Sequence, residues 1–231
     1  MSTKIITISL IVLFLLSGNT YSQNKQQQSV YEQAGTIKLK DPKAVMVGYR
    51  QPGNDVFEIS LDDVGKYTGH VCAGISSAYI LTQQALVLLY PNGEIPVRGQ
   101  ISIAASANAD HLEVASYIVR ARQNDPESKG KNIAIVDTNI VSAQGTVTLI
   151  FKRADNGKMV KAVFNKNKLL TPKLKKKMMP LKKKMMNGTA SDKEKTEFAK
   201  TVQEVVTLII TNTPEGIITV SECDKYSFPK Q

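Results

Sequence analysis

The longest apolar pattern in the chain covers residues 74–89. Apolar side chains recur there every three to four residues, as on a helix with a broad apolar face: Ile75, Ala78, Tyr79, Leu81, Ala85, Leu86, Leu88 and Leu89. The turn-forming stretch "YPNGE" follows at once and ends the pattern. Helical spacing returns over residues 109–122, at Leu112, Ala115, Tyr117, Ile118 and Val119. The first segment is therefore predicted to be a largely buried helix, and the second a further helix.

Strand-like patterns occupy four segments, near residues 97–105, 132–138, 145–153 and 158–165. The last two are joined by "ADNGK", whose Asn156-Gly157 pair favours a hairpin. The order is helix, strand, helix and then several strands, so the elements do not alternate regularly. We therefore predict an α+β fold, in which helix 74–89 packs against a mixed or antiparallel sheet.

The C-terminal part contains the hexapeptide LKKKMM twice, on either side of Pro180. The seven-residue offset places four apolar residues on one helix face: Leu174, Met178, Leu181 and Met185. Ser191 and Glu194 form a capping-box pattern ahead of a second apolar run. We expect helices 172–187 and 191–211 to form a hairpin that turns at Asn187-Gly188. The Met and Lys stripes suggest either a membrane-surface or acidic partner, or packing on the core with solvated lysines.

The first residues have the pattern of a secretory signal peptide. Lys4 precedes the apolar run 5–16, and the small residues Thr20 and Ser22 occupy the −3 and −1 positions before the expected cleavage site. The run is shorter than the roughly 20 residues that a spanning helix needs. We expect export to the periplasm or the extracellular space, with no transmembrane span after cleavage. The predicted organisation is a signal peptide (1–22), a flexible glutamine-rich leader (23–42), an α+β domain (43–170) and a lysine-rich helical hairpin with a C-terminal strand or tail (171–231).

The chain carries a formal net charge of +10 and contains no tryptophan. Seven of its lysines lie between Lys173 and Lys184, so the excess charge belongs mainly to one predicted helix. Few aromatic residues lie among these lysines, and single-strand binders use aromatic rings to stack bases. No nucleic-acid partner is therefore expected.

Two scarce donor residues stand together at the predicted start of helix 74–89. His70 and Cys72 lie between Gly69 and Gly74, in a chain that has only two histidines and two cysteines. A thiol at a helix N-terminus faces unsatisfied N–H groups, which favour its thiolate form. Thiolate and neutral imidazole are preferred ligands of zinc and related metals. This spacing makes a divalent-metal site one interpretation, with incidental residues as the other.

Residues 56–165, about half of the chain, resemble the FmdE-like family, which is named after a component of formylmethanofuran dehydrogenase. The motif of that family is an HGHxCPG stretch that opens a helix, and Gly69, His70, Cys72 and Gly74 match it, whereas Thr68 and Ala73 replace its first histidine and its proline. In the family's second motif, C-x-x-D-A, Asp110 takes the cysteine position and Glu113 the aspartate position. The C-terminal zinc finger found in many members is absent. The resemblance implies a fold, the location of a metal site and a possible homodimer, but no reaction.

We therefore expect zinc or another divalent metal to bind His70 and Cys72, with further ligands from Asp110, His111 or Glu113. An alternative for His111 is an exposed position in a first helical turn. For Cys72 the alternatives are a free thiol or a disulfide to Cys223, which export would permit. In those cases the protein would be a non-catalytic binding or structural module. No phosphate loop, serine elbow or dinucleotide motif occurs in the sequence, so no catalytic residue is assigned and enzyme activity stays open.

Overall fold

The computed structural model describes residues 30–107, 109–122 and 131–229. The predicted signal peptide and the start of the glutamine-rich leader lie outside these residues. The elements follow in the order β1 (Thr36–Lys40), α2 (Pro42–Met46), β2 (Val56–Ser60), α3 (Leu61–Thr68), α4 (Ala73–Leu89), β3 (Ile101–Ala105), α5 (Ala109–Val119), β4 (Ala134–Val136), β5 (Thr146–Arg153), β6 (Met159–Asn165), α6 (Lys166–Leu169), α7 (Pro172–Met186), α8 (Asp192–Ile210) and β7 (Ile218–Glu222). The predicted α+β class is confirmed.

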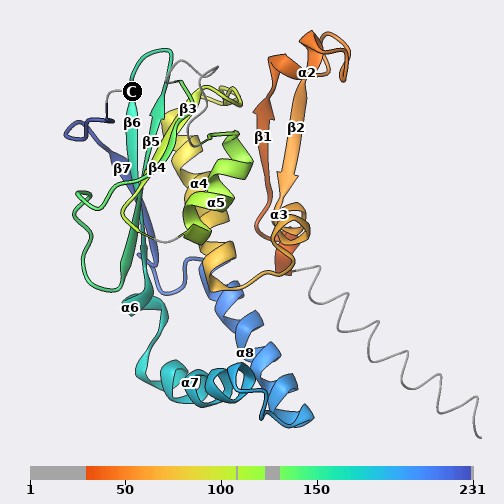
Figure 1. Cartoon of the computed structure of the whole chain (residues 1–231), viewed down its shortest axis with the longest axis vertical. Helices are drawn as coiled ribbons and strands as arrows, with labels where there is room; N and C mark the ends of the chain where they lie inside the picture. The colour runs from red at the N-terminus through yellow and green to blue at the C-terminus, as the bar shows by residue number, and fades with distance from the viewer. Residues whose placement is uncertain (1–29, 108, 123–130, 230–231) are drawn as a thin grey trace, which may run out of the picture.

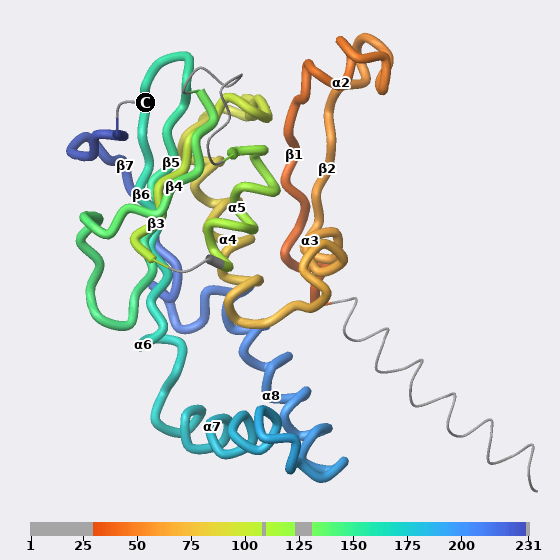
Figure 2. The backbone as a smooth tube through the Cα atoms, viewed as in Figure 1, coloured from red at the N-terminus to blue at the C-terminus, as the bar shows by residue number. Residues whose placement is uncertain are grey.

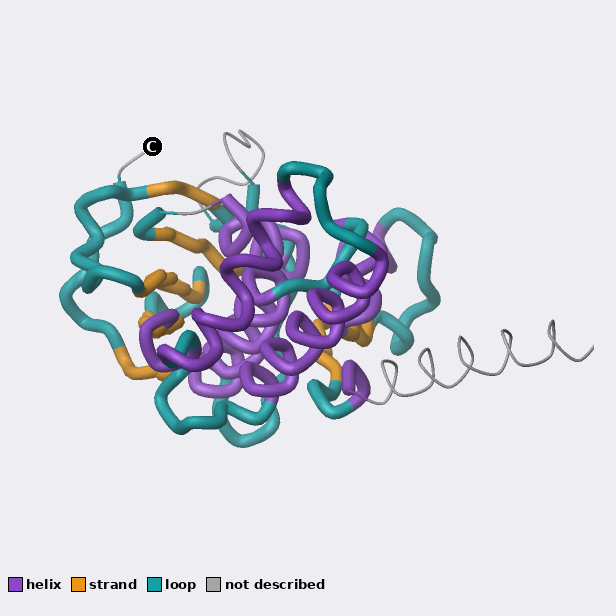
Figure 3. The backbone as a smooth tube through the Cα atoms, turned by 90° about the horizontal axis from the view of Figure 1, so that it is seen from below, coloured by secondary structure: helices purple, strands orange, loops and turns teal. Residues whose placement is uncertain are grey.

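The described elements form three layers (Figure 1). A five-stranded sheet has the order β4-β3-β5-β6-β7, in which β3 and β4 are parallel and the other neighbours are antiparallel. Helices α4 and α5 cover one face of it. The two-stranded antiparallel ribbon β1–β2 lies on the other side of these helices (Figure 2). Viewed from below, helices again lie between the two groups of strands (Figure 3).

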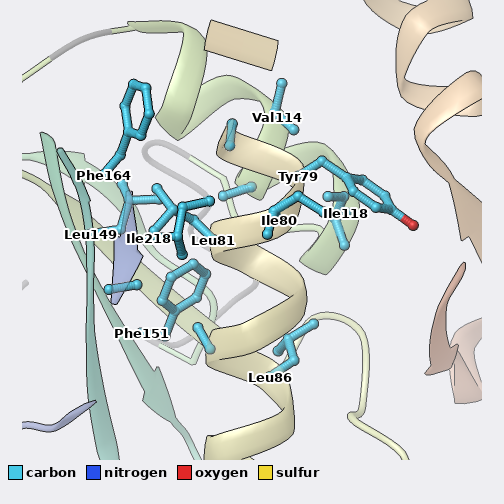
Figure 4. Close-up of a cluster of buried hydrophobic side chains, with 14 of the residues drawn as sticks. Tyr79, Ile80, Leu81, Leu86, Val114, Ile118, Leu149, Phe151, Phe164 and Ile218 are labelled. Atoms are coloured by element: carbon cyan, nitrogen blue, oxygen red, sulfur yellow. The ribbon is translucent and has the colours of Figure 1, made fainter. Parts of the chain in front are cut away.

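Helix α4 lies at the centre of the molecule and is buried on most of its circumference. Its Leu81 faces Phe151 and Phe164 of the sheet, whereas Tyr79 points its hydroxyl away from the sheet (Figure 4). That hydroxyl donates to the carbonyl oxygens of Gly35, at 2.8 Å, and Ile59, at 2.9 Å, beside β1 and at the end of β2. The broad apolar face predicted for this segment reflects packing on both the sheet and the ribbon.

The structure differs from two sequence expectations in the first half of the chain. Residues 36–40, expected in a flexible leader, form β1, whose Ile37 and Leu39 are buried in the main core. The strand expected over 97–105 is interrupted at Gly99, which has a φ of 80°. Val97 pairs with Lys40 instead, and only Ile101–Ala105 join the large sheet. A left-handed glycine therefore separates two segments that read as one strand.

The C-terminal helices form as predicted, but they are not separate from the α+β core. Ser191 and Glu194 make the capping box of α8, and Gly188 adopts a φ of 67° in the turn between α7 and α8. Val205 and Ile209 of α8 belong to the main core, and β7 is the edge strand beside β6. The division at residue 170 thus cuts through one continuous core. Among the described helices, none combines the length and apolar character needed to cross a membrane.

Candidate metal site at the start of helix α4

The short connection between α3 and α4 carries His70 and Cys72. Helix α3 begins with a capping box between Ser60 and Asp63 and ends at Gly69, whose φ is 78°. The Thr68 hydroxyl donates to the carbonyl oxygen of Val64, at 2.9 Å, and to that of His70, at 2.8 Å. A left-handed residue at this position ends a helix and reverses the chain, and glycine adopts it at the lowest cost. The connection is therefore tied to the last turn of α3.

The imidazole of His70 is exposed on this connection. Its Nδ1 lies 3.2 Å from the carbonyl oxygen of Thr68. When Nδ1 carries the proton and donates to that carbonyl, Nε2 keeps its lone pair. Metal-binding histidines commonly use this arrangement, in which the backbone fixes the tautomer of the ligand.

Cys72 and Asp110 both lie close to Gly74. Cys72 is the N-cap residue of α4, and its thiol makes no capping hydrogen bond. A Cβ atom added at Gly74 would lie 3.0 Å from Oδ2 of Asp110 and 3.7 Å from Sγ of Cys72. Asp110 stands in the first turn of α5, so the starts of α4 and α5 bring a carboxylate and a thiol to the same place. The positive ends of the two helices favour negative charge there.

His111 points away from this place and into the core. Its side chain is 1% exposed, and its ring stacks on Phe164 with 5.6 Å between the ring centroids. Ser77 donates its hydroxyl hydrogen to the carbonyl oxygen of Gly74, and Nε2 of His111 lies 2.8 Å from the same hydroxyl oxygen. Nε2–H is therefore the donor, and among the residues that the structure describes the buried Nδ1 has no hydrogen-bond partner. Burial, with a smaller contribution from Lys166, lowers the pKa of His111 to about 4. Neither the predicted ligand role nor the exposed alternative describes this residue.

Glu113 is exposed one turn further along α5 and is engaged with Tyr67. Burial, followed by the charge of Glu113 and its hydrogen bond to the hydroxyl, raises the pKa of Tyr67. The Tyr67 ring also stacks on Tyr117, with 4.4 Å between centroids. Sequence reasoning gave Tyr67 no role, although it lies three residues before His70. The charge of Glu113 thus acts on Tyr67 of α3.

The two cysteines are both free thiols. Cys72 packs against the main core, whereas Cys223 packs with Tyr226 and Phe228 in a second cluster around Ala104 and Ile150. Alternate residues of β3 and β5 supply these two clusters, which lie on opposite faces of the sheet. The disulfide considered for Cys72 is therefore not formed in this structure.

Of the five predicted ligands, the structure brings Cys72 and Asp110 together and leaves His70 exposed two residues from Cys72. Within residues 30–107, 109–122 and 131–229, no group of three or more His, Cys, Asp or Glu side chains is arranged to hold a metal ion. The donor types suit zinc, which binds thiolate, imidazole and carboxylate.

Neither the models of known protein families nor the curated proteins gave a match to the chain.

Proposed function

We propose that the protein binds a divalent metal ion, zinc or a similar ion, at the start of α4 through Cys72, Asp110 and His70. The proposal is supported chiefly by the nearness of the Cys72 thiol and the Asp110 carboxylate to the Cβ position of Gly74. Because Gly74 has no side chain, no Cβ atom crowds either group there. The interaction of Nδ1 with Thr68 leaves the Nε2 atom of His70 available as the third donor.

Three protein ligands would leave one position of a tetrahedral zinc ion for water or a small ligand. A metal in that state can polarise a bound oxygen or activate water, which is the chemistry that an open site supplies. His111 is not included in this ligand set, because its Nε2 atom is hydrogen-bonded to the Ser77 hydroxyl in the core. The resemblance to the FmdE-like family supports the same location, through the positions of His70, Cys72 and Asp110.

The second candidate is a non-catalytic binding or structural module in which Cys72 stays a free thiol. The observation that favours it is the lack of three assembled donors among the described residues.

Zinc titration of the reduced protein by calorimetry separates the two candidates. The metal-site proposal predicts one zinc ion bound per chain, and an affinity loss of at least tenfold in the Asp110→Asn variant. The matched control is Asp62→Asn, which removes an exposed carboxylate from the neighbouring helix α3. Equal zinc binding by wild type and Asp110→Asn would contradict the proposed ligand set, and no binding at all would favour the module with a free thiol.

We also propose, from the signal-peptide pattern and the family resemblance, that the mature protein is exported and forms a homodimer. N-terminal sequencing of the protein from its own host should give a chain that begins near Gln23. Light scattering of the purified mature protein should give a mass near twice that of one chain. An intact Met1 contradicts export, and the mass of a single chain contradicts the dimer.

A further inference from the structure

Helix α7 presents an outward face on which lysines surround exposed methionines. Burial fixes its orientation, because Leu174 and Leu181 are buried and Met178 packs against the main core. Met179 and Met186 point the other way and are 56% and 77% exposed. They are seven residues apart, so they lie two turns apart on the same side of the helix. Figure 1 shows α7 at one end of the molecule, below the sheet.

The positions around Met179 are all lysines. Neighbours on a helix surface are three and four residues apart, and at these distances from Met179 stand Lys175, Lys176, Lys182 and Lys183. The last two are also the neighbours of Met186 at the same intervals. Met179 therefore lies between positively charged side chains, and Met186, the last residue of α7, has two of them on its N-terminal side.

Little of this charge is neutralised within the described part of the molecule. Of the seven lysines of α7, Lys177 pairs with Glu204 and Lys184 with Glu194 on α8. Among the described residues, the remaining five make no ion pair, and α7 itself contains no acidic residue. Both ion pairs lie on the side of α7 that faces α8. Of the five other lysines, four are the neighbours of Met179, and the fifth is Lys173.

We propose that α7 docks the protein onto an anionic lipid surface. An apolar side chain between lysines suits this partner, because methionine can enter the acyl boundary while the ammonium groups stay among the headgroups. A lipid surface carries negative charge at many lateral positions. This suits the four lysines around Met179, which make no ion pair within the described part of the chain. The helix lies on the surface and does not span it.

The direct test is sedimentation of the full mature chain with vesicles of phosphatidylglycerol and phosphatidylcholine in a one-to-two ratio. Binding is expected in low salt, together with release at about 0.5 M NaCl, because salt screens exposed charges. Vesicles of phosphatidylcholine alone should not bind. Each lysine near an anionic surface contributes about a fivefold gain in affinity. The quadruple variant should therefore bind at least a hundredfold more weakly: Lys175→Gln, Lys176→Gln, Lys182→Gln and Lys183→Gln.

A matched control removes the same charge from exposed lysines outside α7: Lys43→Gln, Lys131→Gln, Lys193→Gln and Lys225→Gln. It should keep most of the binding. Equal loss in both quadruple variants would mean attraction by net charge alone and would overturn the proposal. Failure of the wild type to bind anionic vesicles would overturn it too, as would binding to soluble polyglutamate in preference to vesicles, which would indicate an acidic protein partner.

Because the chain contains no tryptophan, the emission of one introduced indole reports whether α7 enters the lipid layer. Met186→Trp introduces a single indole on the proposed docking face. Its emission should shift to the blue with anionic vesicles, because the indole enters an apolar layer, and should not shift with phosphatidylcholine vesicles. Binding with no change in emission would contradict insertion of this face. Neither readout depends on metal, so the docking surface and the metal site can fail separately.

Discussion

At the residue scale, His111 is a buried neutral histidine with a consequence for stability at low pH. Its pKa is lowered to about 4 in the folded protein, from a usual value of 6.5, chiefly by burial. Between these values the unfolded chain binds a proton that the folded chain excludes, so stability falls as the pH falls through this window. The free energy of unfolding should drop by up to about 1.4 kcal/mol per pH unit from this group.

Urea denaturation at pH 7.5 and pH 5 measures this effect. The pH dependence should be smaller in His111→Gln than in wild type. His70→Gln is the matched control, since it replaces the other histidine of the chain, which is exposed, and it should behave as wild type. An unchanged pH dependence in His111→Gln would show that the buried ring does not govern acid stability.

Gly74 also gives a prediction at this scale, because a side chain at this position would crowd Asp110. In Gly74→Ala the new methyl group would lie 3.0 Å from Oδ2 of Asp110, so that carboxylate must move. Asp110 is exposed, and alanine favours a helix by up to about 1 kcal/mol. Zinc affinity should fall while the melting temperature stays equal or rises. A melting temperature that falls, with zinc affinity unchanged, would mean that Gly74 serves packing alone.

At the element scale, one hydroxyl joins the β1–β2 ribbon to the central helix. The fully buried Tyr79 donates to the carbonyl oxygens of Gly35 and Ile59. Tyr79→Phe leaves both carbonyls without this donor, so the unfolding free energy should fall by about 1–3 kcal/mol. Hydrogen exchange of the β1 and β2 amides should speed up more than that of β5 and β6. Equal acceleration in both sheets would contradict a local role in attaching the ribbon.

The elements that could be predicted from sequence are those whose pattern repeats over several turns. Helices α4, α7 and α8 are long and periodic, and the Ser191 and Glu194 capping box is local. The strand β1 has only Ile37 and Leu39 as buried residues, and they are buried because α4 lies beside them. The sequence of a five-residue segment between polar stretches does not show that a helix will pack against it. Long-range packing therefore decides the state of the shortest elements.

In the candidate site, too, one feature could be predicted from the sequence and another could not. The inward position of His111 had a signal in the sequence, since His111, Val114, Ala115 and Ile118 share one helix face at intervals of three, four and seven. The neighbourhood of Cys72 and Asp110 had no local signal, because it depends on how α4 and α5 pack side by side. Only the family resemblance connected these two positions.

At the scale of the whole molecule, the core extends across residue 170 and includes α8 and β7. A chain that ends at residue 170 loses Val205 and Ile209 from the core and β7 from the sheet. It should therefore lack a cooperative thermal transition by circular dichroism. The matched control ends at residue 222, which keeps all seven strands, and should unfold cooperatively. A cooperative transition in the shorter chain would mean that residues 43–170 form a domain of their own.

The central claim, a metal ion bound by Cys72 at the start of α4, is tested most directly by cobalt titration of the reduced protein. Cobalt(II) substitutes for zinc, and a thiolate ligand gives it a strong charge-transfer absorption. We predict that this absorption rises to one equivalent in wild type, disappears in Cys72→Ser and persists in Cys223→Ser, whose thiol lies on the other face of the sheet. No charge-transfer band in wild type, or the same band in Cys72→Ser, would contradict the claim.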